Sequence, residues 1–479
     1  MPNLPRPPRL VVGFDLDLTL VDSAPGIGAV LRQIGEELDL DLPVEELTKR
    51  LGPPLGQLLA PYLPAELLEP TVDRFRVLYP HHAIVPTEAL SGAYDAIAAV
   101  RRQGGRVVVV TGKFTANARL HVDHLGFDID HLEGTVWGAG KGEVLRREGA
   151  QIYVGDHVHD VEGALAAGAL SVSVLTGGST RAELEAAGTH VVLESLADFP
   201  AWLEEHLLSN RLAALDADLR SRGSVLVAYS GGADSAFLLA AAARVLGADQ
   251  VVAATGYSDS LPLAERDPAA EFARDLGVRL LTPQTHEMDR PGYRENGPDR
   301  CFFCKAELLD TLVPLAQELG IAHVATGTNA DDALAGFRPG IRAAHERGAI
   351  APLRDAGLTK TQIREASRRL GLPTWDKPAA ACLSSRVAYG LEVTPRRLAR
   401  VERAEAAARA VLAETGLRDL RVRDLGEHAS VEVDPGLLPL AEPLAEQLLA
   451  AVRAAGFPDA VIDPRGFRSG SMNEALSRQ

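Results

Sequence analysis

The sequence has few cysteines and few aromatic residues, and it lacks long apolar runs. Three of its 479 residues are cysteine, and aromatic residues make up 5%. So few cysteines exclude a disulfide-stabilised scaffold, and we expect a cytoplasmic protein. No run approaches the ~18 apolar residues of a membrane-spanning helix, so no membrane association is expected. The first residues also lack the apolar core of a signal peptide.

The chain also lacks an excess of positive charge. Its formal net charge is −16, which argues against the broad basic face that binds nucleic acid. Arginines gathered in one pocket can still bind a small anion. The hydrophobic content of 46% and the charged content of 24% are those of a globular protein, and the length suggests two or three domains.

Strand and helix patterns alternate along the N-terminal part of the chain. Strands are predicted at 10–15, 106–111 and 152–155, and helices at 93–103, 115–125 and 160–167. A largely helical stretch, 24–86, interrupts this alternation, with prolines marking its turns. The alternation predicts a parallel sheet in a doubly wound α/β fold.

The alternation restarts after a polar connector helix at 203–220. Strands are predicted at 224–230, 250–257, 279–283 and 323–328, and helices at 236–246 and 360–370. Thr359 and Gln362 can form a capping box at the start of the last helix. From residue 387 onwards, a hairpin of 421–425 with 429–433 indicates a small α+β domain.

We therefore predict three domains. The first covers 1–205 and contains a helical cap at about 23–87. The second, a doubly wound α/β domain, covers 206–385. The third covers 386–479 and would bind substrate or form an oligomer contact.

Acidic and hydroxyl residues follow the predicted strands of the first domain. The first strand ends in D-L-D-L-T, with Asp15 and Asp17 two residues apart. Two such carboxylates can share one Mg²⁺ and face a phosphate, one attacking phosphorus while the other transfers a proton. Further phosphate and metal ligands of the matching kind follow along the chain: Thr111, Lys141, Asp156 and Asp160.

Together and in this order, these motifs resemble the haloacid dehalogenase superfamily, in particular its phosphoglycolate-phosphatase-like members. The resemblance covers about 9–202 and implies a Rossmann-like phosphatase domain whose cofactor is Mg²⁺. It implies that Asp15 accepts the phosphoryl group and that Asp17 is the acid/base, under a cap that excludes water. It further implies phosphate binding by Thr111 and Lys141, and Mg²⁺ binding by Asp15, Asp17, Asp156 and Asp160. Leu18 stands where many relatives have glycine.

A glycine-rich turn follows the strand 224–230. It reads Ser230-Gly231-Gly232-Ala233-Asp234-Ser235 and opens a helix, whose backbone N–H groups and dipole favour an anion. The lysine of a Walker A loop is missing. The turn resembles the PP-loop of the ATP pyrophosphatases, a HUP-like fold, and implies ATP binding, with Asp234 either binding Mg²⁺ or bracing the loop. A second turn would face the same cleft with Gly327, Thr328 and Asn329.

The three cysteines lie in two segments. Cys301 and Cys304 form C-F-F-C, a spacing that lets both thiolates bind one metal, and Cys382 lies in A-A-A-C-L-S-S-R. Three thiolates on a [4Fe–4S] cluster leave one iron free to hold an external sulfur. A structural zinc site completed by a histidine such as His286 is the alternative. A disulfide within C-F-F-C would leave Cys382 unused.

The stretch 210–475 resembles LarE, the family of ATP-dependent sulfur transferases that make the pincer ligand of the nickel cofactor of lactate racemase. The matching motifs are S-G-G-A-D-S, R-C-F-F-C-K, G-T-N-A-D-D, L-G-L-P-T-W-D-K-P-A-A-A-C-L-S-S-R and R-G-F-R-S-G-S-M-N. The family adenylylates a carboxylate of a pyridinium dicarboxylate mononucleotide, and a protein-bound sulfur then displaces AMP. Some members sacrifice a cysteine at the position of Cys382. Members with the C-x-x-C pair hold a [4Fe–4S] cluster instead, which implies a ligand role for Cys382 here.

Four arginines are candidates to bind the phosphate or carboxylate of such a substrate. They are Arg386, Arg421, Arg423 and Arg468. Arg468 is the strongest candidate because small hydroxyl residues beside it can also donate to an anion.

Two other functions share parts of these motifs. A tRNA thiolase has the same ATP loop, although the acidic balance argues against RNA. A zinc-stabilised, amide-forming ligase would transfer no sulfur. The family resemblance also suggests a homo-oligomer, and the phosphatase would trim a mononucleotide or a related phosphate ester, or remove a damaged by-product.

Overall fold

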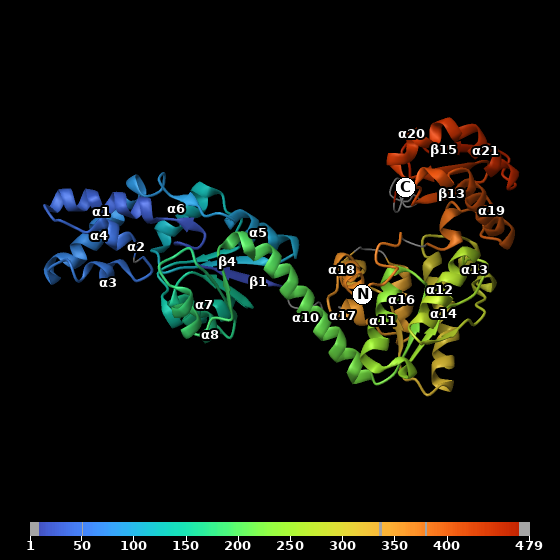
Figure 1. Cartoon of the computed structure of the whole chain (residues 1–479), viewed down its shortest axis with the longest axis horizontal. Coiled ribbons are helices and arrows are strands. Elements are labelled where there is room, and N and C mark those ends of the chain that lie inside the picture. Colours follow the sequence, from blue (N-terminus) through green and yellow to red (C-terminus); the bar gives the residue numbers. More distant parts are fainter. Residues whose placement is uncertain (1–8, 50, 335–337, 379–380, 469–479) are drawn as a thin grey trace. The chain divides into compact units, whose positions relative to one another are not determined.

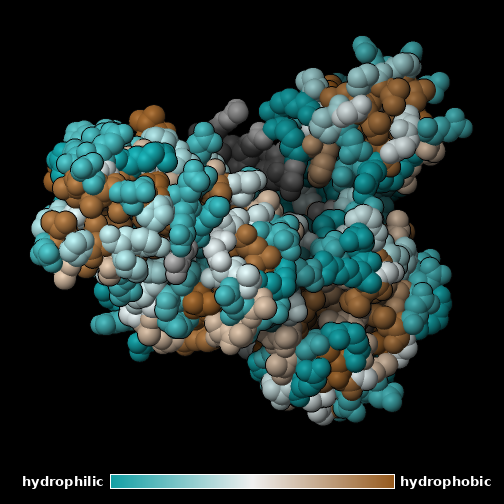
Figure 2. Space-filling model, turned by 60° about the vertical axis from the view of Figure 1, so that its left-hand side comes forward, coloured by the Kyte–Doolittle hydropathy of each residue, from teal (hydrophilic) through white to brown (hydrophobic). Residues whose placement is uncertain are grey.

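The computed structural model describes residues 9–49, 51–334, 338–378 and 381–468 (Figure 1). The chain forms two compact units, Met1–Leu207 and Leu208–Gln479. Within the described ranges, every helix is too short or too polar to span a bilayer. Figure 2 shows mainly hydrophilic side chains on the face in view, with apolar ones in smaller groups.

The first unit is built on a six-stranded parallel sheet with the order β5-β4-β1-β6-β7-β8. Its strands are β1 (Val11–Phe14), β4 (Arg106–Val110), β5 (His131–Glu133), β6 (Ile152–Gly155), β7 (Leu170–Val174) and β8 (Val191–Leu193). Alternate residues of the strands enter two different hydrophobic clusters, with Val109 in one and Val108 in the other. Both faces of the sheet are therefore buried, which explains why β4 reads R-V-V-V-V.

Helices connect these strands, and a helical cap is inserted between two short strands. The connecting helices are α5 (Ala93–Arg102), α6 (Thr115–Leu125), α7 (Lys141–Glu148), α8 (Val158–Ala167) and α9 (Arg181–Ala186). The cap comprises α1 (Ala24–Leu38), α2 (Val44–Lys49), α3 (Leu55–Leu59) and α4 (Ala65–His82). The chain enters it through β2 (Val21–Asp22) and leaves it through β3 (Glu88–Ala89), which pair antiparallel. The cap has its own hydrophobic core.

The prediction that prolines mark turns throughout the cap is wrong for α4. Pro70 and Pro80 lie inside this helix, and both are exposed. A proline removes one backbone hydrogen bond, but at an exposed position the freed carbonyl can bond to water. Buried side chains such as Phe75 and Tyr79 hold the opposite face of α4 against the rest of the unit. Burial therefore overrides the local preference.

The second unit contains a four-stranded parallel sheet with the order β11-β10-β9-β12. Its strands are β9 (Val225–Ala228), β10 (Val251–Ala254), β11 (Arg279–Leu281) and β12 (Val324–Thr326). The surrounding helices are α11 (Ala233–Leu246), α12 (Leu263–Asp275), α13 (Pro291–Arg294), α14 (Arg300–Glu318), α15 (Ala330–Leu334), α16 (Pro339–Glu346), α17 (Pro352–Asp355) and α18 (Lys360–Arg369). The capping box predicted at the start of α18 is confirmed, with reciprocal hydrogen bonds between Thr359 and Gln362. Two parallel sheets confirm the doubly wound α/β class.

A mixed three-stranded sheet follows in the same unit. The hairpin of β13 (Leu420–Asp424) and β14 (Ala429–Val433) is confirmed within one residue, and β15 (Ala460–Ile462) pairs parallel with β14. Helices α19 (Pro395–Val411), α20 (Leu438–Ala441) and α21 (Ala445–Ala454) accompany it. Its hydrophobic core also includes Tyr293 and Leu383, which precede the predicted boundary at residue 385. The three predicted domain ranges, 1–205, 206–385 and 386–479, stay predictions.

The predicted connector is the helix α10 (Phe199–Arg222), and each of its ends belongs to a different core. Leu203 is fully buried in a cluster of the first unit, whereas Leu215 is fully buried in a cluster of the second. One continuous helix therefore contributes core residues to both units.

We predict that Leu203→Ala destabilises the first unit and Leu215→Ala the second, each by about 2–5 kcal/mol, because a buried leucine leaves a cavity when truncated. Hydrogen exchange measured by mass spectrometry on the whole chain separates the two effects, and each variant is the control for the other. Equal loss of protection in both units from either variant would contradict the division.

Candidate functional site

Three buried carboxylates meet at the carboxyl edge of the six-stranded sheet. Asp15 directly follows β1 and Asp156 directly follows β6, and these strands are hydrogen-bonded neighbours. Asp160 lies in the first turn of α8, where it completes a capping box with His157. The ligand oxygens of the three aspartates all lie within 4.8 Å of one another, the only such group of three among the described residues. Carboxylate oxygens at this spacing suit Mg²⁺.

A buried lysine compensates part of this negative charge. The Lys141 ammonium is 2.8 Å from Asp15 Oδ1 and 2.6 Å from Asp160 Oδ1. It also donates to the hydroxyl of Tyr153, which in turn donates to the Val110 carbonyl at 2.6 Å. Burial alone would lower the pKa of Lys141, but the two carboxylates raise it well above its usual value. Lys141 is therefore charged at neutral pH.

One lysine cannot neutralise three carboxylates. Burial raises the pKa of Asp15 to about 7, against the opposing charge of Lys141. Burial, and then the charge of Asp160, raises the pKa of Asp156 well above its usual range. A bound Mg²⁺ would balance the excess negative charge of the three carboxylates. They therefore fit the cation that the sequence predicts.

Asp17 is not part of the three-carboxylate group. Its Oδ1 lies 2.6 Å from the ammonium of Lys113. Burial alone would raise the pKa of Asp17, but the ion pair with Lys113 lowers it. The backbone N–H of Lys113 donates to Thr111 Oγ1 at 3.3 Å, so this hydroxyl helps to hold the turn after β4. A side-chain ligand role for Asp17 on Mg²⁺ stays a prediction.

Three residues of this site had no role in the sequence analysis. Lys113 follows Thr111 by two residues, and Thr19 follows Asp17 by two residues. Their position beside these predicted site residues was the sequence feature that could have identified them. The Thr19 hydroxyl donates to Asp156 Oδ1 at 2.7 Å. Tyr153 lies within β6 and had no signal. The backbone of Leu18 has φ of 55°, which explains why glycine suits this position.

The cap completes a cavity of about 550 Å³ over these residues. Tyr79 on α4 reaches His121 on α6, with 2.8 Å between its hydroxyl and His121 Nε2. The ammonium of Lys113 lies 5.0 Å from the centre of the Tyr79 ring. A cap side chain therefore contacts the lysine that pairs with Asp17.

The glycine-rich turn of the second unit forms a compact loop after β9. Gly231 has φ of 72°, a conformation that favours glycine. The Ser235 hydroxyl accepts from the Ser230 N–H at 3.2 Å and donates to the Gly232 carbonyl at 3.1 Å. Lys377 Nζ donates to the Gly231 carbonyl at 3.0 Å and pairs with Glu265. Hydrogen bonds from within the loop and from Lys377 therefore hold its conformation.

The second turn lies against this loop, as its position after β12 predicts. A Cβ on Gly327 would lie 2.9 Å from the Ser235 nitrogen, so only glycine permits the approach. Asn329 Nδ2 donates to Asp234 Oδ2 at 3.1 Å. Asp234 Oδ1 is buried and has no hydrogen-bond partner, and burial raises the pKa of this carboxyl. The unused oxygen fits a Mg²⁺ ligand.

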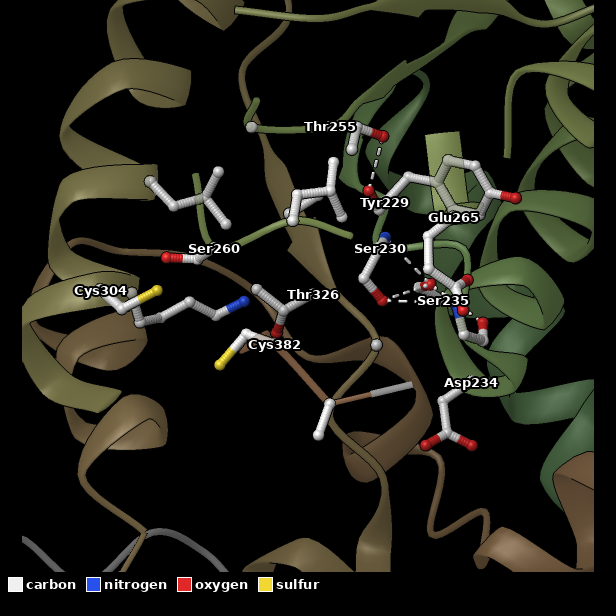
Figure 3. A pocket seen from close by; sticks show the side chains of 18 of the residues that line it. Tyr229, Ser230, Asp234, Ser235, Thr255, Ser260, Glu265, Cys304, Thr326 and Cys382 are labelled. Atoms are coloured by element: carbon white, nitrogen blue, oxygen red, sulfur yellow. Dashed lines mark hydrogen bonds between the residues drawn. The ribbon is translucent and has the colours of Figure 1, made fainter. Parts of the chain in front are cut away.

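One cavity of about 440 Å³ joins the glycine-rich loop to two of the cysteines. Figure 3 shows Ser230, Ser235 and Asp234 on one side and Cys304 and Cys382 on the other. Cationic side chains also line the cavity, namely Lys305, Lys360, Arg364 and Lys377. Thr328 lines it as well. The structure thus brings most of the predicted ATP residues and two of the three cysteines to one cavity.

The three cysteines come together from two segments. Cys301 and Cys304 lie in the first turns of α14. Burial, and then the charge of Cys382, raises the pKa of Cys304 above its usual range. The same two causes raise the pKa of Cys301. Three thiolates would therefore repel one another here unless a cation lay between them.

A buried hydrogen-bond network fixes the two cysteine segments to each other. Arg300, next to Cys301, donates to the Ser384 carbonyl at 2.8 Å and also to the side chain of Asn296. Tyr293 bonds to the Ser260 hydroxyl at 2.5 Å and to the hydroxyl of Ser384. These polar residues had no role in the sequence analysis, although Arg300 and Ser384 lie inside quoted motifs. They hold the Cys382 segment beside α14.

The predicted substrate arginines lie near the three-stranded sheet. Arg386 pairs with Glu405 at 2.9 Å and donates to the Cys382 carbonyl, and Arg423 pairs with Glu432 at 2.8 Å. Burial, and then the charge of Arg386, lowers the pKa of Arg421 to about 10. Arg468 lies 3.8 Å from Asp463, and the residues after it lie outside the described part of the chain. Arg386 and Arg423 are thus engaged in internal ion pairs, and substrate binding by the four arginines stays a prediction.

We predict that metal-free protein loses roughly 1–3 kcal/mol of stability as pH rises from about 4 to 7. Between the unfolded pKa of Asp15, 3.8, and its folded pKa, about 7, the folded state binds a proton that the unfolded state has released. Stability from this group is therefore present at low pH and lost as pH rises through that window. Thermal unfolding of the first unit in a chelator measures the effect, and Mg²⁺ should reduce it.

Asp15→Asn should flatten this pH dependence, because the amide cannot ionise. The exposed Asp128, which pairs with Arg101 at the surface, provides the control Asp128→Asn. An unchanged slope in Asp15→Asn would contradict the assignment of the pH dependence to Asp15.

Comparisons with known proteins match different relatives to the N-terminal and the C-terminal parts of the chain. The haloacid dehalogenase-like hydrolase family matches residues 12–165, and the HAD-hydrolase-like family matches residues 145–199. The phosphoglycolate phosphatase of Caulobacter vibrioides is 28% identical over 216 residues, which are 40% of this chain and 88% of that enzyme.

Two further relatives match more than half of the chain. An uncharacterized protein of Synechocystis sp. is 39% identical over 274 residues, which are 57% of this chain and 100% of that protein. The pyridinium-3,5-bisthiocarboxylic acid mononucleotide synthase of Lactiplantibacillus plantarum is 31% identical over 271 residues, 57% of this chain and 96% of that enzyme. The chain therefore joins an N-terminal haloacid dehalogenase-like hydrolase domain to a C-terminal region that belongs to the LarE family of that synthase.

Proposed function

We propose that the protein is bifunctional, with a sulfur transferase in its second unit and a phosphatase in its first. The transferase would use ATP to activate a carboxylate of a pyridinium dicarboxylate mononucleotide and convert it to a thiocarboxylate, a step of nickel-pincer cofactor synthesis. The observation that supports this most is the single cavity shared by the glycine-rich loop, Cys304 and Cys382. Adenylylation and sulfur transfer need both groups at one site.

In the first step a substrate carboxylate oxygen attacks the α-phosphorus of ATP, and pyrophosphate leaves. The N–H groups of the loop 230–235 and the ammonium of Lys360 would hold the phosphates. Asp234 would bind the accompanying Mg²⁺ through its unused oxygen. In the second step a sulfur nucleophile attacks the acyl carbon, the new C–S bond forms, and AMP leaves with the former carboxylate oxygen.

The three cysteines would hold a [4Fe–4S] cluster, which supplies an iron that can carry the transferred sulfur. The C-x-x-C pair of Cys301 and Cys304 supports a cluster over mononuclear zinc, because the members of the LarE family that carry this pair hold a cluster.

We predict about four iron and four sulfide per chain in protein purified without oxygen. Cys382→Ala should lose most of the iron, because one of three ligands is missing. His286→Ala tests the zinc alternative, since that histidine is the candidate fourth ligand of a Cys₃His site and no ligand of the cluster. Tight zinc with no iron, lost in His286→Ala, would contradict the cluster. Iron retained in Cys382→Ala would return Cys382 to the role of a sacrificial sulfur donor.

The first unit would hydrolyse phosphate monoesters with the help of Mg²⁺. Asp15 Oδ attacks phosphorus and the ester oxygen leaves, and water then hydrolyses the phosphoaspartate. Asp17 would protonate the leaving oxygen and later take a proton from the water. Its ion pair with Lys113 lowers the pKa of Asp17 and so favours the ionised carboxylate. A substrate phosphate that competes for Lys113 would weaken this pair and raise the pKa of Asp17, which prepares it as an acid.

We predict that the protein releases phosphate from a set of nucleotides and sugar phosphates, and that Asp15→Asn abolishes the release because no oxygen nucleophile remains. Asp128→Asn, at the surface, should keep full activity. Malachite-green detection of phosphate in the presence of Mg²⁺ measures both. If no ester is hydrolysed in an Asp15-dependent way, the domain has a structural or regulatory role instead. The predicted homo-oligomer and the predicted cytoplasmic location stay predictions.

A further inference from the structure

The cavity of the first unit has room for a ligand of drug size, and the cap side of its lining is mainly apolar. Its volume of about 550 Å³ lies within the 300–1,000 Å³ typical of sites that bury a drug-sized ligand. The cap contributes mainly apolar residues to its lining: Leu51, Pro53, Pro54, Leu55, Leu58, Leu68, Val72 and Phe75. A bulky leaving group with apolar faces fits this lining.

The cavity offers few cations beyond those already paired. Lys113 and Lys141 both line it, and each forms an ion pair with an aspartate of the site. Among the described lining residues, Arg76 is the remaining lysine or arginine, and it pairs with Asp73. A substrate with a second strongly charged anionic group would therefore find little to bind it.

Trp137 forms an aromatic wall beside the phosphate site. It lines the cavity and is partly exposed. Two histidines brace it, with ring centres 5.7 Å away for His157 and 4.5 Å away for His159. A Cβ on Gly112 would lie 3.1 Å from Trp137 Cε3, so the indole ring lies against the residue that follows Thr111. The wall therefore begins next to the predicted phosphate ligand.

A second aromatic ring borders the same cavity. Phe114, three residues after Thr111, is 43% exposed. The guanidinium of Arg76 on the cap lies 5.3 Å from its ring centre. Two partly exposed aromatic rings in a substrate cavity are surfaces on which a flat ring can stack.

We propose that this site takes mononucleotide-type monoesters, in which ribose 5-phosphate carries a flat nitrogen heterocycle, and that Trp137 stacks on the heterocycle. The phosphate would lie between Thr111 and Lys141, and the ring would reach the Trp137 wall. This inference rests on the proposed phosphatase function. It assigns to the first unit the same class of ligand as the proposed substrate of the second, a ring on a ribose phosphate.

The reaction is a hydrolysis that needs water alone as co-substrate. The bond between phosphorus and the 5′-oxygen breaks, and the oxygen of water ends in inorganic phosphate. One proton goes to the 5′-oxygen, so the product is a nucleoside. A pyridinium ring carries a positive charge, which adds a cation–π attraction to the stacking, whereas a purine stacks without it.

The test compares three esters with the full-length protein and Mg²⁺: nicotinate mononucleotide, AMP and ribose 5-phosphate. We expect kcat/KM to be about tenfold or more higher for the two ring-bearing esters. Trp137→Ala should reduce this ratio to near one, and Trp137→Phe should retain most of it. Trp375→Ala, a partly exposed tryptophan of the second unit, is the matched control and should leave the ratio unchanged. A higher value for nicotinate mononucleotide than for AMP identifies the cationic ring as the preferred one.

Two results would overturn the inference. One is a wild-type protein that hydrolyses ribose 5-phosphate as well as the ring-bearing esters. The other is an equal loss for all three esters in Trp137→Ala, which assigns a structural role to the tryptophan. If no ester is hydrolysed, the phosphatase proposal fails. Calorimetric measurement of the binding of the three esters to Asp15→Asn then tests independently whether the cavity recognises the ring. Ring-dependent binding that Trp137→Ala weakens supports it, and its absence overturns it.

Discussion

The parallel direction of the strands is the constraint on which both sites depend. Because neighbouring parallel strands end at the same edge of a sheet, residues that follow them meet although the chain separates them widely. In the first unit this brings Asp15 beside Asp156, after β1 and β6. In the second it brings Gly327 against Ser235, after β12 and β9. Both sites are thus consequences of one topological rule applied twice.

Charge buried at these edges then needs compensation, and the two units supply it differently. In the first unit, Lys141 lies among the carboxylates and leaves a surplus of negative charge that a divalent cation would balance. In the second unit, Arg300 donates hydrogen bonds to the side chain of Asn296 and to a carbonyl of the Cys382 segment. Arg300 positions this segment, and its charge also opposes the rise in the pKa of Cys301 that burial and the charge of Cys382 cause. The three carboxylates of the first site fit Mg²⁺, and a metal group bound by the three cysteines stays a prediction.

The recognised motifs predicted much of both sites because each motif is contiguous and ends a strand. The glycine-rich loop, the second turn and the carboxylates after β1 and β6 all lie where the sequence placed them. The α4 prolines were misjudged because burial of Phe75 and Tyr79 outweighs the lost backbone bonds. The substrate arginines were chosen by residue type, and type alone does not reveal that Glu405 and Glu432 bind two of them.

By itself, the sequence determined the class of fold, the resemblance to two families and the candidate site residues, since these follow from local motifs along the chain. The tertiary structure decided which side chains assist them. Lys113 pairs with Asp17, Tyr153 bonds to Lys141, and Trp137 borders the phosphatase cavity. Such contacts join residues far apart in the chain, and no local propensity encodes them. They exist only once the sheet has brought its loops to one edge and the cap has covered them.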